Sequence, residues 1–254
     1  MIQNLIPAFY LVVPPIEFGL LSERNLFMSK VLPISILLLS FVVCGCSSYK
    51  AVSYTGGTLA IEGSGVSKQE SRSVASFDRI RLDSIIDVSV SFGDNPGIIV
   101  TADDNLLPII RTDVSEQQLI IDCTSSLTTN LELKAEIVMP PGVLVACSLD
   151  STGDLIIEGY SGDQLVLKSD GVGDITVSGS VDQVHVFVES TGDVDLSALQ
   201  ARQAFVYNDS VGDATVNASE LVDGSVSSVG DLIILGDPKE VRATENSVGD
   251  IIRK

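Results

Sequence analysis

The chain has 254 residues, a formal net charge of −19 and a single histidine, a length that suits one or two domains. Such an acidic chain repels phosphate backbones and anionic lipid headgroups, which argues against nucleic acid as a partner and against electrostatic docking on a membrane. Hydrophobic residues make up 45% of the sequence, aromatic residues only 5%, and there are 21 glycines and no tryptophan. This composition favours an all-β, turn-rich fold over a helical bundle.

An apolar run of 13 residues, 31–43, follows the basic residues Arg24 and Lys30. It is shorter than the roughly 20 residues that a membrane-spanning helix needs, and it has the length of the apolar part of a signal peptide. The run ends in Val43-Cys44-Gly45-Cys46, which resembles a bacterial lipobox. We therefore expect cleavage before Cys46 and lipidation of its thiol, the alternative being a plain signal peptide with a coincidental cysteine.

Residues 1–45 thus form the predicted signal segment. Residues 1–27 are apolar, contain three prolines and precede a second methionine, Met28, which would open a signal peptide of ordinary length. We hypothesise that translation starts at Met28. Residues 46–73 are rich in serine and glycine and lack sustained periodicity, which predicts a flexible tether between the lipid anchor and the folded domain.

The stretch 74–149 contains short β-type runs, separated in places by turns such as Asp94–Gly97 and Pro140–Gly142. We expect irregular opening rungs of a larger β domain, 74–254, with one hairpin-like excursion. The strand candidates are Ile80–Leu82, Ile86–Phe92, Ile98–Ala102, Leu119–Cys123, Leu131–Val138 and Val143–Cys147.

A Gly-Asp pair recurs six times in the remaining stretch, 150–254, at intervals of 20, 19, 20, 18 and 19 residues. A fixed period of this length is typical of a solenoid. The pairs are Gly153-Asp154, Gly173-Asp174, Gly192-Asp193, Gly212-Asp213, Gly230-Asp231 and Gly249-Asp250.

Apolar and polar residues alternate on both sides of each Gly-Asp pair, which is the period of a β-strand with one buried face. Each repeat should therefore contain two short strands, with the glycine and a small residue two positions before it turning the corner between them. One repeat cannot bury its own apolar face, whereas stacked repeats can. The sequence predicts a parallel β-helix of 19–20-residue rungs about 4.8 Å apart. The residues two positions after each glycine are Leu155, Ile175, Val194, Ala214, Leu232 and Ile251.

Over about residues 62–254 the chain resembles the head GIN domain family, a domain of unknown function described as a "putative autotransporter adhesin". The resemblance rests on Phe77-Asp78-Arg79-Ile80, Ile86-Asp87-Val88, Asp103-Asp104-Asn105-Leu106-Leu107 and the repeated S-x-G-D turns, in which Thr or Val often replaces the family's second Ser. It implies a right-handed parallel β-helix, pectate-lyase-like in shape, and no conserved catalytic set.

No catalytic constellation is visible in the sequence. A single histidine, His185, supports no Ser-His-Asp or Cys-His arrangement, and Cys123 and Cys147 lack the spacing of a metal site. An oxidising compartment would permit a Cys123–Cys147 disulfide, but the sequence does not indicate one. Outward carboxylates such as Asp195 would suit a carbohydrate-active enzyme, yet any acidic β-helix offers them. We expect no enzyme and no cofactor.

The aspartates of the six Gly-Asp pairs should stack one per rung. Unit charges about 4.8 Å apart in water repel by roughly 0.9 kcal/mol, so the column needs hydration, turn amides or cations. A Ca²⁺-binding ridge is one interpretation. The favoured one is that each corner carboxylate accepts hydrogen bonds from turn N–H groups. The column consists of Asp154, Asp174, Asp193, Asp213, Asp231 and Asp250.

Aromatic and aliphatic residues occupy outward positions on three adjacent predicted rungs. An exposed apolar patch on an otherwise acidic protein suggests a contact surface for self-association or for a protein or glycan partner. The alternative is that a loop folds over this face. The predicted patch consists of Val166, Lys168, His185, Phe187, Phe205 and Tyr207.

Together these features predict a lipid-anchored cell-envelope β-solenoid that acts as a binding or adhesion scaffold without catalysis. A periplasmic structural or assembly protein is the first alternative, and a carbohydrate-active β-helix enzyme the second. Ser47 and Ser48 follow the lipidated cysteine without the aspartate that often marks inner-membrane retention, so we expect the outer membrane, with either face open.

Overall fold

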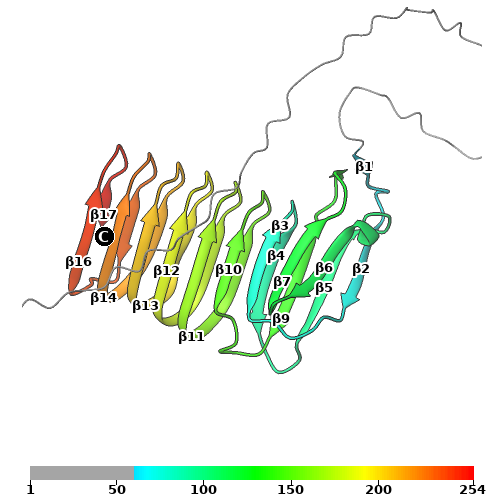
Figure 1. The fold of residues 1–254 in the computed structure, drawn as a ribbon, viewed down its shortest axis with the longest axis horizontal. Helices are drawn as coiled ribbons and strands as arrows, with labels where there is room; N and C mark the ends of the chain where they lie inside the picture. Colours follow the sequence, from blue (N-terminus) through cyan, green and yellow to red (C-terminus); the bar gives the residue numbers. More distant parts are fainter. Residues whose placement is uncertain (1–59) are drawn as a thin grey trace, which may run out of the picture. The chain divides into compact units, whose positions relative to one another are not determined.

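The computed structural model describes residues 60–254, which form stacked parallel coils of strand, a β-solenoid (Figure 1). The all-β prediction is confirmed, because one sheet joins 15 strands and a second joins two. The predicted signal segment, Cys46 and the first part of the predicted tether lie outside the described residues. Within residues 60–254, no helix has the length and apolar character needed to cross a membrane.

In the regular part, each strand runs from one Gly-Asp corner to the next and pairs in parallel with the strand one repeat later. The two short strands expected for each repeat are joined into one long strand, which bends where the ladder shifts register. In the first of these strands the bend lies at Gly159, whose φ of +72° is one that other residues rarely adopt. The strands are β11 (Leu155–Ser169), β12 (Ile175–Val188), β13 (Val194–Asn208) and β14 (Ala214–Val226).

The last coil is divided into separate strands. Gly236 and Asp237 both have positive φ, +86° and +51°, and Pro238 follows them, so one continuous strand cannot pass this point. Parallel pairing with β14 continues on both sides of the break. The strands are β15 (Leu232–Leu235), β16 (Glu240–Glu245) and β17 (Ile251–Arg253).

Alternate residues of the coils point into one continuous apolar core, as the period of two predicts. Burying one Leu, Ile or Val side chain contributes about 1.5–3 kcal/mol, so the stacked columns supply the main stabilisation. Val145 departs from the alternation, because Leu144 is buried in front of β10 (Ala146–Leu149) and Val145 is exposed. The largest side chain buried in the core is that of Tyr160.

The irregular coils do not stack in chain order. β3 and β4 form a first coil, which β7 and β9 cover on one side. The chain then returns to the other side, where β10 pairs with β3 and the start of β11 pairs with β4. The coil that comes first along the chain, β3 with β4, is therefore central in the stack (Figure 1). The strands are β3 (Arg79–Asp83), β4 (Asp87–Phe92), β7 (Gln118–Cys123) and β9 (Lys134–Met139).

Antiparallel strands form the far side of these irregular coils. β5 (Gly97–Asp103) pairs antiparallel with β9, and β6 (Ile110–Ser115) forms a hairpin with β7. The hairpin turn, Glu116-Gln117, has φ values of +51° and +62°, as a two-residue turn matched to the strand twist requires. A 3₁₀ helix, η1 (Leu107–Ile109), connects β5 to β6. The structure thus contains the hairpin-like excursion that the sequence predicts.

The predicted tether, 46–73, overlaps ordered structure and its C-terminal boundary is corrected. β2 (Ser67–Arg72) pairs antiparallel with β5, and β1 (Ile61–Glu62) pairs in parallel with β8 (Leu127–Thr128). The sequence allows a short strand near Leu59–Glu62, and β1 lies there. Polar composition concealed β2, because β2 lies at the edge of the sheet with its side chains exposed or half-buried.

Three consecutive residues, Asp103, Asp104 and Asn105, hold the segment between β1 and β2. The carboxylate of Asp103 is fully buried and accepts a hydrogen bond from the Gly65 N–H at 2.6 Å. Asn105 accepts from the Ser64 N–H at 2.8 Å, and its amide donates to the Glu62 carbonyl at 2.9 Å.

The corner glycines are required by close approach of the backbone, not by left-handed φ angles. None of the six has positive φ. A Cβ atom on Gly173 would lie 2.1 Å from the carbonyl oxygen of Gly153, and one on Gly192 would lie 2.3 Å from that of Gly173. Each corner is thus seated on the carbonyl of the corner before it, and only glycine fits there.

Candidate binding face

The aspartate column is a rung-to-rung hydrogen-bond ladder. The backbone N–H of each aspartate donates to Oδ1 of the aspartate one coil earlier, for example from Asp174 to Asp154 at 2.9 Å and from Asp193 to Asp174 at 2.8 Å. The same contact recurs through Asp250. The expectation that these carboxylates accept backbone N–H groups is confirmed, with the amide of the next coil as the donor.

The ladder has a seventh member, Asp87, which sequence reasoning missed. Its Oδ1 accepts the N–H of Asp154 at 2.9 Å, so the ladder starts in the first irregular coil. Ile86 stands where later coils have glycine, and the Gly153 corner rests on the Ile86 carbonyl. A search for Asp-apolar pairs without the preceding glycine would have found it.

This geometry gives the aspartates a structural role. One carboxylate oxygen of each of the first six ladder members is occupied by an amide, which offsets part of the repulsion along the column. Among residues 60–254, no group of three or more His, Cys, Asp or Glu side chains is arranged to hold a metal ion. The calcium interpretation therefore gains no support from the ladder.

The serine two residues before some of these glycines closes the corner. Ser210 Oγ donates to the Gly212 carbonyl at 2.7 Å, and Ser190 Oγ donates to the Gly192 carbonyl at 3.2 Å. Both side chains are buried, so the hydroxyl satisfies a carbonyl that water does not reach easily. At these two corners the serine of the S-x-G-D pattern therefore has a structural role.

The two cysteines of the β domain are separate free thiols. Cys123 lies in β7 and Cys147 in β10, and β3 lies between these strands. Burial raises the pKa of the Cys147 thiol to about 12, and burial together with nearby Asp122 raises the pKa of Cys123. Both thiols are therefore protonated at neutral pH.

The groups considered for catalysis do not converge. Asp195 Oδ1 accepts the Ser197 N–H at 2.8 Å in a local turn, and His185 makes a ring contact. Arg202 is held between Asp182 and Glu220. Asp195 and Arg202 thus have polar partners, whereas His185 contacts Phe205 through its ring face.

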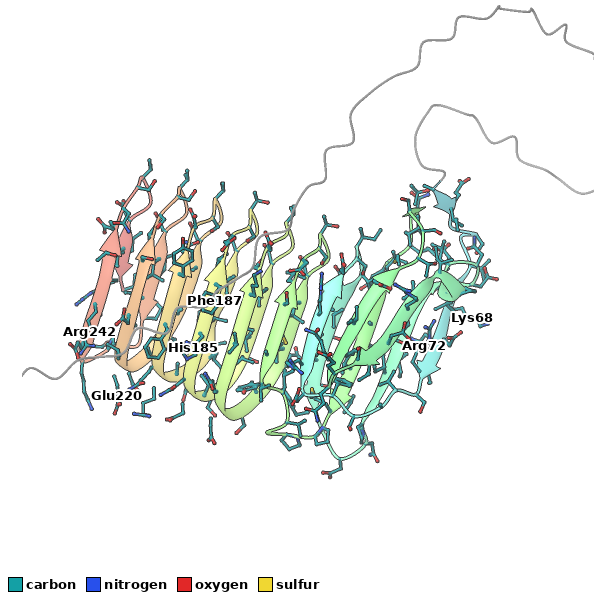
Figure 2. All side chains as sticks on the ribbon, viewed as in Figure 1. Lys68, Arg72, His185, Phe187, Glu220 and Arg242 are labelled. Atoms are coloured by element: carbon teal, nitrogen blue, oxygen red, sulfur yellow. The ribbon has the colours of Figure 1, made fainter. Side chains whose placement is uncertain are left out.

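The predicted patch is assembled by the sheet register, and we call its six residues the aromatic strip. Val166 pairs with His185, which pairs with Phe205; beside them, Lys168 pairs with Phe187, which pairs with Tyr207. Two parallel outward columns therefore cross three adjacent coils. Figure 2 labels one residue of each column, His185 and Phe187.

One pair of rings in the aromatic strip is stacked, and the other two rings are open to solvent. His185 and Phe205 stack with ring centroids 4.7 Å apart and planes 10° apart. Phe187 and Tyr207 are 43% and 39% exposed. No segment within residues 60–254 covers them, so the strip is an uncovered apolar surface in the described part of the chain.

A hollow lies at the end of the aromatic strip. The next coil continues the two columns with Asp223 and Ser225, which are smaller than the Phe205 and Tyr207 rings that they follow. The hollow left above these smaller residues has a volume of about 350 Å³. Sequence reasoning missed it, although Gly224 in an otherwise apolar inward column was a signal. The hollow is lined by Val186, Phe187, Phe205, Val206, Tyr207, Asp223, Gly224 and Ser225.

The aromatic strip has different chemistry on its two flanks. On one side lies a column of amides, in which the Gln183 side chain donates to the Gln203 side chain at 3.2 Å. On the other side, two residues further along each strand, lie the exposed carboxylates Asp170, Glu189 and Asp209.

A second cavity of about 720 Å³ lies at the opposite, irregular part of the solenoid. The connection from β2 to β3 covers it with Val74 and Phe77, and the start of β5 and the end of β9 contribute Ile99 and Met139. Arg72 at its edge donates to the carbonyls of Ile110 and Leu107, both at 2.8 Å. The lining of the cavity is mainly apolar, and the guanidinium of Arg72 is engaged by these two carbonyls.

The coils and the open aromatic face define a β-solenoid repeat protein with an exposed sheet surface. Residues 76–238 match the model of a family described as "Putative auto-transporter adhesin, head GIN domain". The match covers more than half of the chain, so the chain belongs to the head GIN domain family. The resemblance seen in the sequence is confirmed.

Two crystal structures are similar to this chain. A "putative adhesin" from Bacteroides fragilis NCTC 9343 is 20% identical with a TM-score of 0.66, and covers 77% of this chain and 100% of its own. A "putative lipid binding protein" from Parabacteroides distasonis ATCC 8503 is 20% identical with a TM-score of 0.54 and the same coverage. At this identity the likeness establishes the shared fold. A search of curated proteins gives no match.

Proposed function

We propose that this protein is a non-catalytic binding scaffold of the cell envelope, carried on a lipid at Cys46, and that it contacts its partner through the aromatic strip. The observation that carries the proposal is the uncovered strip itself, with Phe187 and Tyr207 about two-fifths exposed on adjacent coils. Exposure of such rings to water is unfavourable in free energy, and contact with a partner removes this penalty. The family description as an adhesin supports the same class of function.

The binding proposal is tested with full-length protein and two matched variants. We expect labelled protein to bind saturably to intact cells or envelope fragments of the producing bacterium, or to the surface that it colonises. The Phe187→Ser/Tyr207→Ser variant should lose this binding. Ile156→Ser is the control, because Ile156 is also 43% exposed but lies in the half of β11 that pairs with β4. Equal binding by all three proteins would contradict the proposal.

The lipid anchor is tested separately. We expect wild-type protein to take up a radiolabelled fatty acid and to sediment with membranes, and Cys46→Ser to do neither, whereas Cys44→Ser should behave as wild type. Protease treatment of intact cells, with an epitope tag inserted after Ser53, then distinguishes the two remaining placements. Loss of the tag supports a surface adhesin; survival until the outer membrane is opened supports the alternative of a periplasmic structural protein.

The cavity beneath the β2–β3 connection favours a second candidate function, binding of an apolar ligand such as an acyl chain. Its volume lies in the range of small-molecule sites, and Val74, Phe77, Ile99 and Met139 give it an apolar lining. The structural neighbour named as a lipid binding protein is consistent with this candidate. Saturable binding of a fluorescent fatty acid that Val74→Glu abolishes would support it; no binding by wild type would eliminate it.

A further inference from the structure

We propose that the hollow beside Phe205 and Tyr207 binds an uncharged oligosaccharide, with sugar rings stacked on the aromatic strip. This inference rests on the proposed function, because it names the ligand class of the same face. It adds three residues of the next coil, Asp223, Gly224 and Ser225.

The aromatic strip provides the stacking surface. The outward side chains of a parallel ladder stand side by side about 4.8 Å apart, so the rings of Phe187, Phe205 and Tyr207 form an extended apolar surface. The C–H face of a pyranose packs on such rings, and aromatic side chains supply large contact area at small conformational cost. Since the chain has no tryptophan, phenylalanine and tyrosine must provide this contact.

The hollow also supplies hydrogen-bonding groups, of which Asp223 lies beside Arg242 of the next coil and attracts it electrostatically. The Asp223 carboxylate, the Ser225 hydroxyl and the Tyr207 hydroxyl line the hollow or its edge and form no side-chain hydrogen bond there. A carboxylate is a strong acceptor for sugar hydroxyls. The amides of Gln183 and Gln203 lie on the adjacent column and can accept or donate further bonds.

Charge selects an uncharged ligand. Asp170, Glu189 and Asp209 along one flank repel acidic polysaccharides, and Lys168 is the one basic residue of the strip. The net charge of −19 adds to this repulsion. Beside the hollow, the charge of Asp223 is partly offset by Arg242, which also forms an ion pair with Glu240 at 2.6 Å. An apolar protein segment over the same hollow would remove water from the Asp223 carboxylate and from the Ser225 and Tyr207 hydroxyls, which is costly. A polyhydroxylated neutral ligand satisfies both the rings and the carboxylate.

The test is a calorimetric titration of full-length protein with neutral tetrasaccharides of glucose, mannose and galactose. The proposed lipid on Cys46 requires that full-length protein be kept in detergent. This detergent must be a zwitterionic amine oxide, because the headgroup of a glycoside detergent is itself a sugar and would compete for the proposed site. We expect saturable binding of at least one tetrasaccharide, with affinity unchanged between low and high salt because the ligand is uncharged. Tyr207→Ser and Phe187→Ser should each weaken it about tenfold or more, and Asp223→Ala severalfold, whereas Ile156→Ser should match wild type.

The outcomes separate this inference from the proposed function. No sugar binding by wild-type protein, or binding that Tyr207→Ser and Phe187→Ser leave intact, overturns the inference. If envelope or surface binding still depends on the strip in that case, the proposed function stands with another ligand. A mass increase in light scattering that the Phe187→Ser/Tyr207→Ser variant loses, without sugar binding, would assign the face to a second copy of the chain and overturn the inference as well. Melting curves of each variant establish that it is folded.

Discussion

The regular coils, 150–254, and the irregular coils, 74–149, share one apolar core but keep their register by different means. In the regular part, from Gly173 onward, each corner Gly rests on the preceding corner Gly and each corner Asp bonds to the preceding corner Asp, so these corners repeat the same two contacts. In the irregular part, antiparallel strands and individual side chains such as Asp103 hold the coils. The register of the regular coils can therefore be predicted from the repeated sequence pattern. The register of the irregular coils depends on single contacts that form only in the folded structure.

The largest effect should follow a corner substitution. Gly173→Ala places a Cβ 2.1 Å from the Gly153 carbonyl oxygen, a backbone atom that cannot move without shifting the coil. We expect a loss of about 3 kcal/mol in the free energy of unfolding, measured with denaturant. Gly97→Ala in the irregular part is the control, since a Cβ there has nothing within 4 Å. Similar losses in both variants would show that crowding is not the reason for the corner glycines.

The junction of the two regions depends on Tyr160. Its buried hydroxyl oxygen lies 3.0 Å from the Leu144 carbonyl oxygen and 2.7 Å from the Gln164 carbonyl oxygen, one on each side of the junction, and its single proton is shared between these two acceptors. Tyr160→Phe keeps the ring and its edge contact with Phe92 but leaves both carbonyls without this donor. We expect a cost of about 1–3 kcal/mol in denaturant unfolding. A cost near zero would mean that water replaces the hydroxyl.

Stability should also fall at alkaline pH. Burial raises the pKa of Tyr160 from its ordinary 10.0 to about 12, with nearby Cys147 and Asp163 contributing, and burial raises that of Cys147 from 9.0 to about 12. The folded state favours the protonated forms, so their contribution is complete below pH 9 and is lost as pH rises to 12. Melting temperatures measured from pH 8 to 12 should decline less steeply in Tyr160→Phe and in Cys147→Ala than in wild type.

The aspartate ladder should show a smaller effect in both regions. Asp193→Ala removes the acceptor of the Asp213 N–H, and Asp87→Ala removes that of the Asp154 N–H. Each should cost about 1 kcal/mol. The matching Asn variants keep the oxygen and remove one repelling charge, so they should equal or exceed wild type. A loss in Asp193→Asn as large as in Asp193→Ala would show that the charge itself is needed, and calcium titration of wild type would then be warranted.

The smallest effect is expected for surface ion pairs. Arg111 contacts Asp122 in the irregular hairpin, and Arg202 contacts Asp182 and Glu220 across the regular coils. These groups are exposed enough for water and salt to screen them. Arg111→Gln and Arg202→Gln should each change the melting temperature less than the ladder variants do. A larger loss in Arg202→Gln would identify the three-residue network as a true link between coils.

The sequence by itself determined the solenoid, the phase of its repeats and the six strip residues, because a fixed period and an alternation of two leave one face for the core. It also identified the carboxylates as amide acceptors. It missed Asp87, because the ladder position there lacks the preceding glycine. It assigned β2 to a tether, since an edge strand with exposed polar residues carries no apolar alternation.

Only the tertiary structure decided the order of the irregular coils, the reason for the glycines and the hollow. The place of β3 between β7 and β10 depends on long-range pairing, which no local pattern specifies. The glycine requirement is a contact between backbones 20 residues apart. The hollow depends on which coil follows Phe205 and Tyr207, because Asp223 and Ser225 become its edge only when stacking places them one rung further along.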